Sequence, residues 1–274
     1  MLYDIMPISL LNRMRTILCS LISFACIFGS TGYAKERWQD DDYIEESFIK
    51  IALQREYKET NHPKIIRWKN PIQLYFASDF GNAKLQKELL SVHSQHLSHI
   101  TKLPIHFTDQ VSDANIFVIF TEYAKLEDKV RQYIGNPDNI RAALNEAICL
   151  GNFRRNGHYE ITRGVIIIPV DYARSKARFL DCVVEEITQL LGLPNDSNDV
   201  YPSVFNDVSV DTYLSPLDYI LLKALYSNTL KPGMNVTQTR ASFADVLTEL
   251  KANGDIKYAK ERVQEFSLKR YLGD

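Results

Sequence analysis

Apolar positions recur with a helical period near the start of the chain and then shorten into strand-like runs. Residues 40–58 place apolar side chains at helical spacing among charges, which predicts an amphipathic N-terminal helix within residues 35–62. The run 72–76 is typical of a strand, and residues 82–100 again follow the helical period. We expect a helix, a strand and a second helix in this order.

The middle of the chain predicts a sheet with helical connections. Residues 105–108 and 114–121 are short apolar strands, and the second is apolar enough for a buried central strand. Residues 126–147 predict a helix in two pieces, interrupted at Gly135-Asn136-Pro137. Asn156-Gly157 predicts a tight hairpin turn with positive φ at both positions, followed by a strand over 164–170.

The last third is mostly helical. Residues 174–191 predict a helix that Gly192 ends, and a turn-rich stretch follows to about residue 213. Ser215-Pro216-Leu217-Asp218 begins a further helix, because serine caps, proline suits the first turn and Asp218 completes the box. A helix over 243–252 lies in a C-terminal helical appendage, residues 235–274. These elements predict an α+β fold with one sheet and two principal helices.

Residues 1–34 have the layout of a secretory signal. Arg13 and Arg15 precede an apolar stretch over 17–28, and Gly32-Tyr33-Ala34 resembles a cleavage site. Cleavage would leave a chain that starts at Lys35, in the periplasm or outside the cell. An uncleaved membrane anchor is the alternative, although the apolar run is short of the about 20 residues that a span needs. No later segment is apolar enough to span.

Composition limits the partners. Hydrophobic residues make up 45% of the 274 residues, enough for a substantial core. Lys and Arg number 32 against 34 Asp and Glu, and no basic stripe stands out. We therefore expect no nucleic-acid binding, which needs a basic surface.

Two of the four cysteines, Cys19 and Cys26, would leave with the signal. Cys149 and Cys182 remain, and an even pair in an oxidising compartment predicts a disulfide between them. Two buried free thiols are the alternative.

One polar group stands out on the helix over 174–191. Glu185 and Gln189 are one helical turn apart and share a face, and Glu186 follows the first of them. Gly192 lets the chain turn, which brings Asn195 or Asp196 back toward that face.

This segment resembles the metzincin zinc-peptidase motif. In that motif two histidines one turn apart bind zinc, the glutamate after the first is the general base, and a third ligand follows the glycine. The resemblance implies that Glu185, Gln189 and Asn195 occupy the three ligand positions and Glu186 that of the base. Phe205 takes the place of the methionine in the turn that follows.

The resemblance extends over residues 72–226 in the order of elements. It implies a metzincin-like domain over residues 63–234, with one mixed, mostly parallel sheet and two principal helices. The Glu-Glu-x-x-Gln pattern, the cysteine pair and the segment 230–234 are similar to a bacterial family called domain of unknown function 2927, a name that supplies no activity.

The departures from the motif decide what we expect of the chemistry. Zinc prefers His nitrogen and Cys sulfur, and both histidines are absent. Glu185, Gln189 and Asn195 offer oxygens and amides, which suit a hard divalent cation better than zinc. Without a metal Glu186 has no activated water to deprotonate. We expect no cofactor and no ordinary zinc-peptidase activity.

Three interpretations of this face stay open. Glu185 and Gln189 are remnants bonded to the turn at Asn195-Asp196, or they line a polar pocket for a peptide, glycan or hard cation. In the third, Glu185 and Glu186 hydrolyse a substrate as acid and base, although adjacent helix residues point about 100° apart.

Two further groups are candidates for contacts. His93, His96 and His99 repeat at spacing three, and a partly solvated helix face is favoured over a metal site. In zinc peptidases the hairpin borders the substrate groove, so the resemblance implies ligand contacts at Arg154, Arg155 and His158.

The leading hypothesis is an exported, non-catalytic binding or scaffolding module of the cell envelope, with a peptide, glycan or envelope protein as partner. The alternative is an atypical hydrolase that uses Glu186 with an unusual metal or none.

Overall fold

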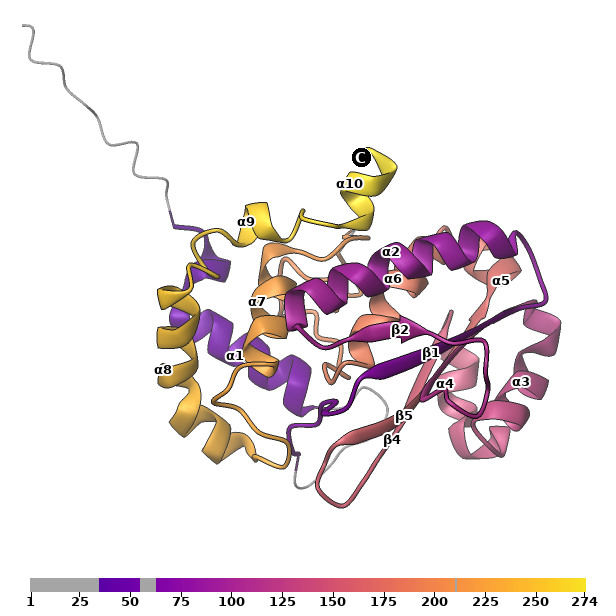
Figure 1. The fold of residues 1–274 in the computed structure, drawn as a ribbon, viewed down its shortest axis with the longest axis horizontal. Helices are drawn as coiled ribbons and strands as arrows, with labels where there is room; N and C mark the ends of the chain where they lie inside the picture. Colours follow the sequence, from indigo (N-terminus) through magenta and orange to yellow (C-terminus); the bar gives the residue numbers. More distant parts are fainter. Residues whose placement is uncertain (1–34, 55–62, 210) are drawn as a thin grey trace, which may run out of the picture. The chain divides into compact units, whose positions relative to one another are not determined.

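The computed structural model describes residues 35–54, 63–209 and 211–274 (Figure 1). The predicted signal sequence lies outside the described residues, as does the end of the predicted N-terminal helix. Residues 35–274 form one unit. In the part of the chain that is described, no helix combines the length and apolar character that a membrane span requires.

One mixed sheet of five strands organises the fold. The strands are β1 (Ile72–Ser78), β2 (Ile105–Phe107), β3 (Ile116–Thr121), β4 (Leu150–Arg155) and β5 (Ile161–Pro169), in the order β2-β1-β3-β5-β4. All neighbours are parallel except β4, which runs antiparallel to β5. The expected mixed, mostly parallel sheet is therefore confirmed, and β4 lies at its edge.

The central strand β3 separates two layers of core. Ile116, Val118 and Phe120 join the large cluster of buried residues, whereas Phe117 and Ile119 join a smaller one. This division follows from the alternation of side chains along a strand. The predicted burial of this strand is confirmed.

Helices cover both faces of the sheet. On the side of the large cluster, α2 (Ala83–Thr101) packs against α6 (Phe179–Gln189). On the other side lie α3 (Leu126–Tyr133) and α4 (Arg141–Glu146), with the short helix η3 (Pro137–Ile140) between them. The predicted interruption near Pro137 is present. The shorter helices η2 (Tyr123–Lys125) and α5 (Val170–Ser175) connect strands to longer helices.

A second group of helices extends the large cluster beyond the sheet. The helices α1 (Asp41–Leu53), α7 (Pro216–Leu225) and α8 (Val236–Ala252) pack together (Figure 1). The rings of Phe48 and Phe243 lie 5.3 Å apart between α1 and α8. The predicted final helix is longer than expected and begins after the N-cap Asn235. The remaining helices are η1 (Arg37–Gln39), α9 (Ala259–Arg262) and α10 (Leu268–Leu272).

The hairpin between β4 and β5 is present, but its predicted turn is wrong. The loop is longer than two residues, and Tyr159 rather than Gly157 takes positive φ, at 63°. Asn156 accepts hydrogen bonds at its side-chain oxygen from the backbone N–H groups of His158 and Glu160. Local bonding by the asparagine side chain thus outweighs the tendency of Asn-Gly toward a tight turn.

The single helix predicted over 174–191 is wrong at its start. Ala177 has φ 57°, and this left-handed residue separates α5 from α6. The backbone N–H of Arg178 then donates to Ala173 O across 2.8 Å. Alanine at positive φ carries no signal in the sequence, because only glycine and asparagine adopt it commonly.

The predicted capping box at Ser215 is confirmed, and it has a tertiary role. The buried Asp218 accepts hydrogen bonds from Ser203 Oγ at 2.6 Å and from the backbone N–H of Val204 at 3.1 Å. Burial raises the pKa of Asp218 to about 6. One side chain thus caps α7 and holds the loop that leads to Phe205.

Candidate functional site

A cavity of about 990 Å³ lies between α6, the edge strand β4 and α4. Its lining includes four of the predicted site residues, which are Glu185, Glu186, Gln189 and Asp196. Both cysteines of the predicted pair also line it. The side chains that the sequence singles out on α6 therefore border a shared space.

Gln189 is the centre of the polar group. Its side-chain amide donates to Asp196 Oδ1 at 2.9 Å and reaches Glu185 Oε1 at 3.5 Å. Asp196 returns to α6 because Gly192, at φ 119°, reverses the chain. A Cβ at this glycine would collide with the backbone carbonyl of Ile66, so only glycine fits.

Glu186 lies on a different side of α6 from Glu185. Its carboxylate rests against the backbone of β4 at Gly151, where an added Cβ would meet Glu186 Oε2. Glu186 is buried, whereas Glu185 is half-buried. The two carboxylates both line the cavity, but they approach it from different directions, as their adjacent helix positions require.

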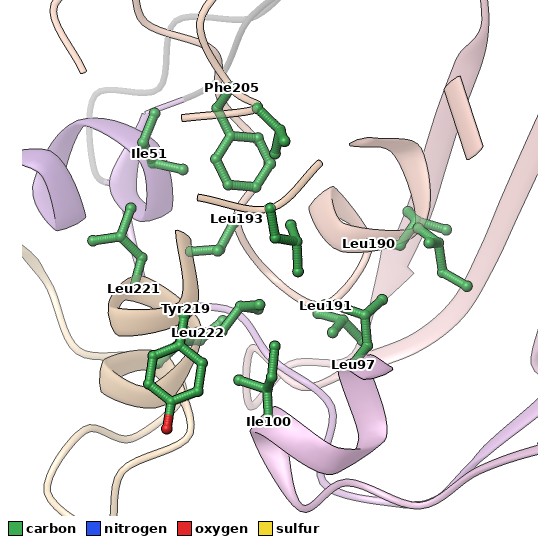
Figure 2. Close-up of a cluster of buried hydrophobic side chains, with 14 of the residues drawn as sticks. Ile51, Leu97, Ile100, Leu190, Leu191, Leu193, Phe205, Tyr219, Leu221 and Leu222 are labelled. Atoms are coloured by element: carbon green, nitrogen blue, oxygen red, sulfur yellow. The ribbon is translucent and has the colours of Figure 1, made fainter. Parts of the chain in front are cut away.

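Asn195 and Phe205 lie outside the cavity lining. Asn195 is buried, and its side-chain amide donates to Lys50 O in α1 at 3.0 Å. Figure 2 shows Phe205 in a cluster of buried hydrophobic side chains with Ile51 and Leu193. These two predicted binding residues therefore do not border the cavity, and Asp196 rather than Asn195 lies beside Gln189.

The carboxyl group of Glu185 lies near two other acidic side chains, Asp196 and Glu186. Burial raises the pKa of Glu185 well above its usual range, and the nearby carboxylates of Asp196 and Glu186 raise it further. Arg178 opposes this shift. Its guanidinium lies 2.9 Å from Asp181 and 3.8 Å from Glu185 Oε2.

The donor set of the site bears on metal binding. Among the described residues, no group of three or more His, Cys, Asp or Glu side chains is placed to hold a metal ion. Glu185 and Asp196 provide carboxylate oxygens, but the Gln189 amide nitrogen lies between them as a donor. A hard cation would need an oxygen at that point. The arrangement fits a hydrogen-bonded polar surface better than a cation site.

The predicted disulfide joins two walls of the cavity. Cys149, directly before β4, is bonded to Cys182 of α6, with their Cα atoms 5.9 Å apart. Because Cys182 lies one turn before Glu185 and Glu186, the bond holds the edge strand close to the polar face of α6.

The interpretation of the α2 histidines as a solvated face is wrong for two of the three. His93 and His96 are each 1% exposed. His93 Nε2 lies 3.0 Å from both Val184 O and Thr188 Oγ1, so this ring bonds to the buried side of α6. Burial lowers the pKa of His93 to about 3 and that of His96 to about 4.

The predicted ligand contacts on the hairpin lie outside the cavity. Arg154, Arg155 and His158 are exposed on the hairpin and do not belong to the cavity lining.

Sequence reasoning missed Arg178, Asp181 and Gly151. The i,i+3 spacing of Arg178 and Asp181 was a usable signal for a pair. Nothing in the sequence pointed to Gly151, because its role depends on the approach of α6.

Comparison with known proteins identifies the family. Residues 41–245 match the family model described as "Protein of unknown function (DUF2927)". No curated relative matches the chain. The matched stretch contains every element that lines the cavity, as well as the disulfide. The chain therefore belongs to the DUF2927 family.

Proposed function

We propose that this chain is an exported binding module on a metzincin-like scaffold, without zinc-peptidase activity, and that it holds a peptide in the cavity beside β4. One observation carries the proposal. The polar face of α6, with Glu185, Gln189 and Asp196, forms one wall of the cavity, and an edge strand forms another.

Several features support the metzincin-like scaffold. The helix that bears the motif positions, α6, is followed by a glycine at positive φ, and Asp196 returns to it. The buried Phe205 then precedes a capped helix, α7. This order agrees with what the resemblance implies.

The edge strand supports a peptide as ligand. β4 pairs with β5 on one side, and in the described part of the chain no strand covers its other side. Leu150, Gly151, Asn152 and Phe153 of this strand line the cavity. An extended peptide can add to such an edge through main-chain hydrogen bonds, while side chains enter the cavity.

The chemistry of the motif positions supports binding over zinc catalysis. Glu185, Gln189 and Asn195 replace the nitrogen donors that a catalytic zinc needs. The polar groups bond to one another and to α1 instead. The disulfide agrees with an oxidising compartment, and export requires the predicted signal to function.

Backbone hydrogen exchange tests the proposal. The purified protein is incubated with a random nine-residue peptide library, and exchange is followed by mass spectrometry. We expect slower exchange in β4, because its free edge becomes hydrogen-bonded. The other edge strand, β2, is the internal control and should not change. Absence of protection in β4, or equal protection of β2, would refute a peptide site.

Elemental analysis of the same preparation tests the second part. We expect no stoichiometric zinc. Zinc at one equivalent, together with peptide cleavage that disappears in Glu186→Gln, would overturn a non-catalytic role. N-terminal sequencing of the exported protein should begin at Lys35.

A second candidate function is hydrolysis without zinc. The raised pKa of Glu185 favours its protonated form, and Glu186 lines the same cavity. General acid–base hydrolysis requires a protonated acid, the role that Glu185 would take, and a base, the role that Glu186 would take. In this case both Glu185→Gln and Glu186→Gln would abolish turnover of a cleavable peptide while peptide binding persists.

A further inference from the structure

The lining of the cavity is strongly acidic. Seven of its residues are acidic and two are basic, namely Asp138, Glu146, Asp181, Glu185, Glu186, Asp196 and Asp207 against Arg141 and Arg178. Each arginine already pairs with carboxylates of the protein itself. Both positive charges are thus partly neutralised, and the excess of acidic side chains makes the cavity favour a cation.

Glu185 is a mostly buried acidic side chain whose bonds within the protein are weak. It is 16% exposed, and the nearest donors that contact its oxygens are Gln189 Nε2 at 3.5 Å and Arg178 Nη2 at 3.8 Å. Both distances lie at or beyond the limit of a good hydrogen bond. Burial without strong partners favours the protonated form of this carboxyl group, and a cationic donor of a ligand would favour the ionised form and pair with it.

Arg178 shows which kind of cation fits. Arg178 directly precedes α6. Its guanidinium pairs with Asp181 at 2.9 Å, and its outer nitrogen lies 3.8 Å from Glu185 Oε2. The planar guanidinium suits carboxylates because it offers paired donors. An internal arginine thus already occupies the approach to Glu185, at a distance too long to satisfy it.

The geometry points to a basic side chain of the bound peptide, arginine above all, as the group recognised at this end of the cavity. Glu185 and Asp196 receive it, and Arg178 competes with it for Glu185. This inference rests on the proposed peptide site and adds the chemical class of its ligand. It gives the acidic side chains on this face of α6 a role other than metal binding.

Three designed peptides test the inference on the wild-type protein. They are nine residues long, acetylated and amidated, carry a neutral fluorophore, and differ only at the central residue, which is arginine, citrulline or glutamate. Citrulline keeps the size of arginine without its charge. We expect the arginine peptide to bind at least tenfold more tightly than the citrulline peptide, and the glutamate peptide to bind more weakly still, by fluorescence anisotropy.

Variants locate the effect. Glu185→Gln should reduce the preference for arginine over citrulline to less than threefold. Arg178→Gln should tighten binding of the arginine peptide severalfold, because the internal competitor is gone. Asp128→Asn, at an exposed residue outside the cavity lining, is the matched control and should change nothing.

The outcomes separate this inference from the proposed function. Equal affinity for arginine and citrulline peptides, or an arginine preference that survives Glu185→Gln, overturns the inference and leaves the peptide site standing. Failure of all three peptides to bind overturns both.

Discussion

The side-chain amide of Gln189 donates to the carboxylate of Asp196 across 2.9 Å. This bond joins the last turn of α6 to the loop after Gly192. The resemblance to the metzincin motif implies that Gln189 stands where that motif has a zinc-binding histidine. Here the same position closes a hydrogen bond within the protein, and Asp196, one residue after the expected third ligand, is its partner.

Restoring nitrogen donors should restore zinc binding if the scaffold is metzincin-like. Glu185→His with Gln189→His places two imidazoles one turn apart beside Asp196. We expect zinc to raise the melting temperature of this double variant. The stabilisation should reach about 2.7 kcal/mol at a hundredfold excess over Kd.

The single variant Gln189→His is the control for this experiment and should respond weakly, because it lacks the second imidazole. An equal response of the wild-type protein, or none from the double variant, would count against the scaffold.

Gly192→Ala should destabilise the fold by about 3 kcal/mol. Alanine would have to adopt φ 119°, which L residues rarely do. Its Cβ would also collide with the backbone carbonyl of Ile66. Denaturant unfolding measures the loss. Gly157→Ala is the matched control, since nothing lies within 4 Å of that position. A loss below 1 kcal/mol at Gly192 would show that this turn relaxes easily.

Acid should weaken the fold through His93. The pKa of His93 is lowered to about 3 by burial, so the unfolded chain takes up a proton below pH 6.5 while the folded chain does not. The free energy of unfolding is therefore unaffected by His93 above pH 6.5. Below pH 6.5 it falls by about 1.4 kcal/mol per pH unit because of this residue. His93→Gln removes this contribution, while a similar one from His96, whose pKa is lowered to about 4, remains.

We expect the unfolding free energy of His93→Gln to decline less steeply than that of the wild type between pH 6.5 and 4.5. The exposed Gln110, which carries no titratable group, provides the control, because Gln110→Ala should leave the slope unchanged. Parallel slopes for wild type and His93→Gln would mean that His93 is protonated in the folded state.

Loss of the disulfide should cost about 3–4 kcal/mol, because the bond closes a loop between residues 33 apart in sequence. Cys149→Ser with Cys182→Ser should lower the unfolding midpoint accordingly. Peptide binding should weaken as well, since the bond joins β4 to α6 across the cavity. Thiol labelling of the unreduced, denatured protein provides an independent check. Modification of both cysteines would show that the pair is not bonded.

Much of the fold was predictable because its signals are local. Apolar periodicity predicted the helix that became α2 and the buried strand β3, and the capping box predicted the start of α7. The spacing of Glu185 and Gln189 predicted that they share one face of a helix. These properties depend on backbone geometry within a few residues, which the sequence states directly.

The sequence signals failed at uncommon local backbone conformations and where distant segments pack together. The turn at Asn156 is set by side-chain hydrogen bonds within a longer loop, and the break at Ala177 requires an uncommon backbone conformation. The histidines of α2 were expected to be partly solvated, but the packing of α2 against α6 buries His93 and His96.

By itself the sequence predicted most of the helices and strands, the disulfide partners and the polar side chains at positions 185, 186 and 189. Only the tertiary structure decided that Asp196 rather than Asn195 reaches Gln189, that Asn195 bonds to α1 and that Glu186 rests on Gly151. The physical reason is that hydrogen bonds and close backbone approaches depend on distances between segments remote in the chain. Periodicity and spacing report only which side of its own element a residue occupies.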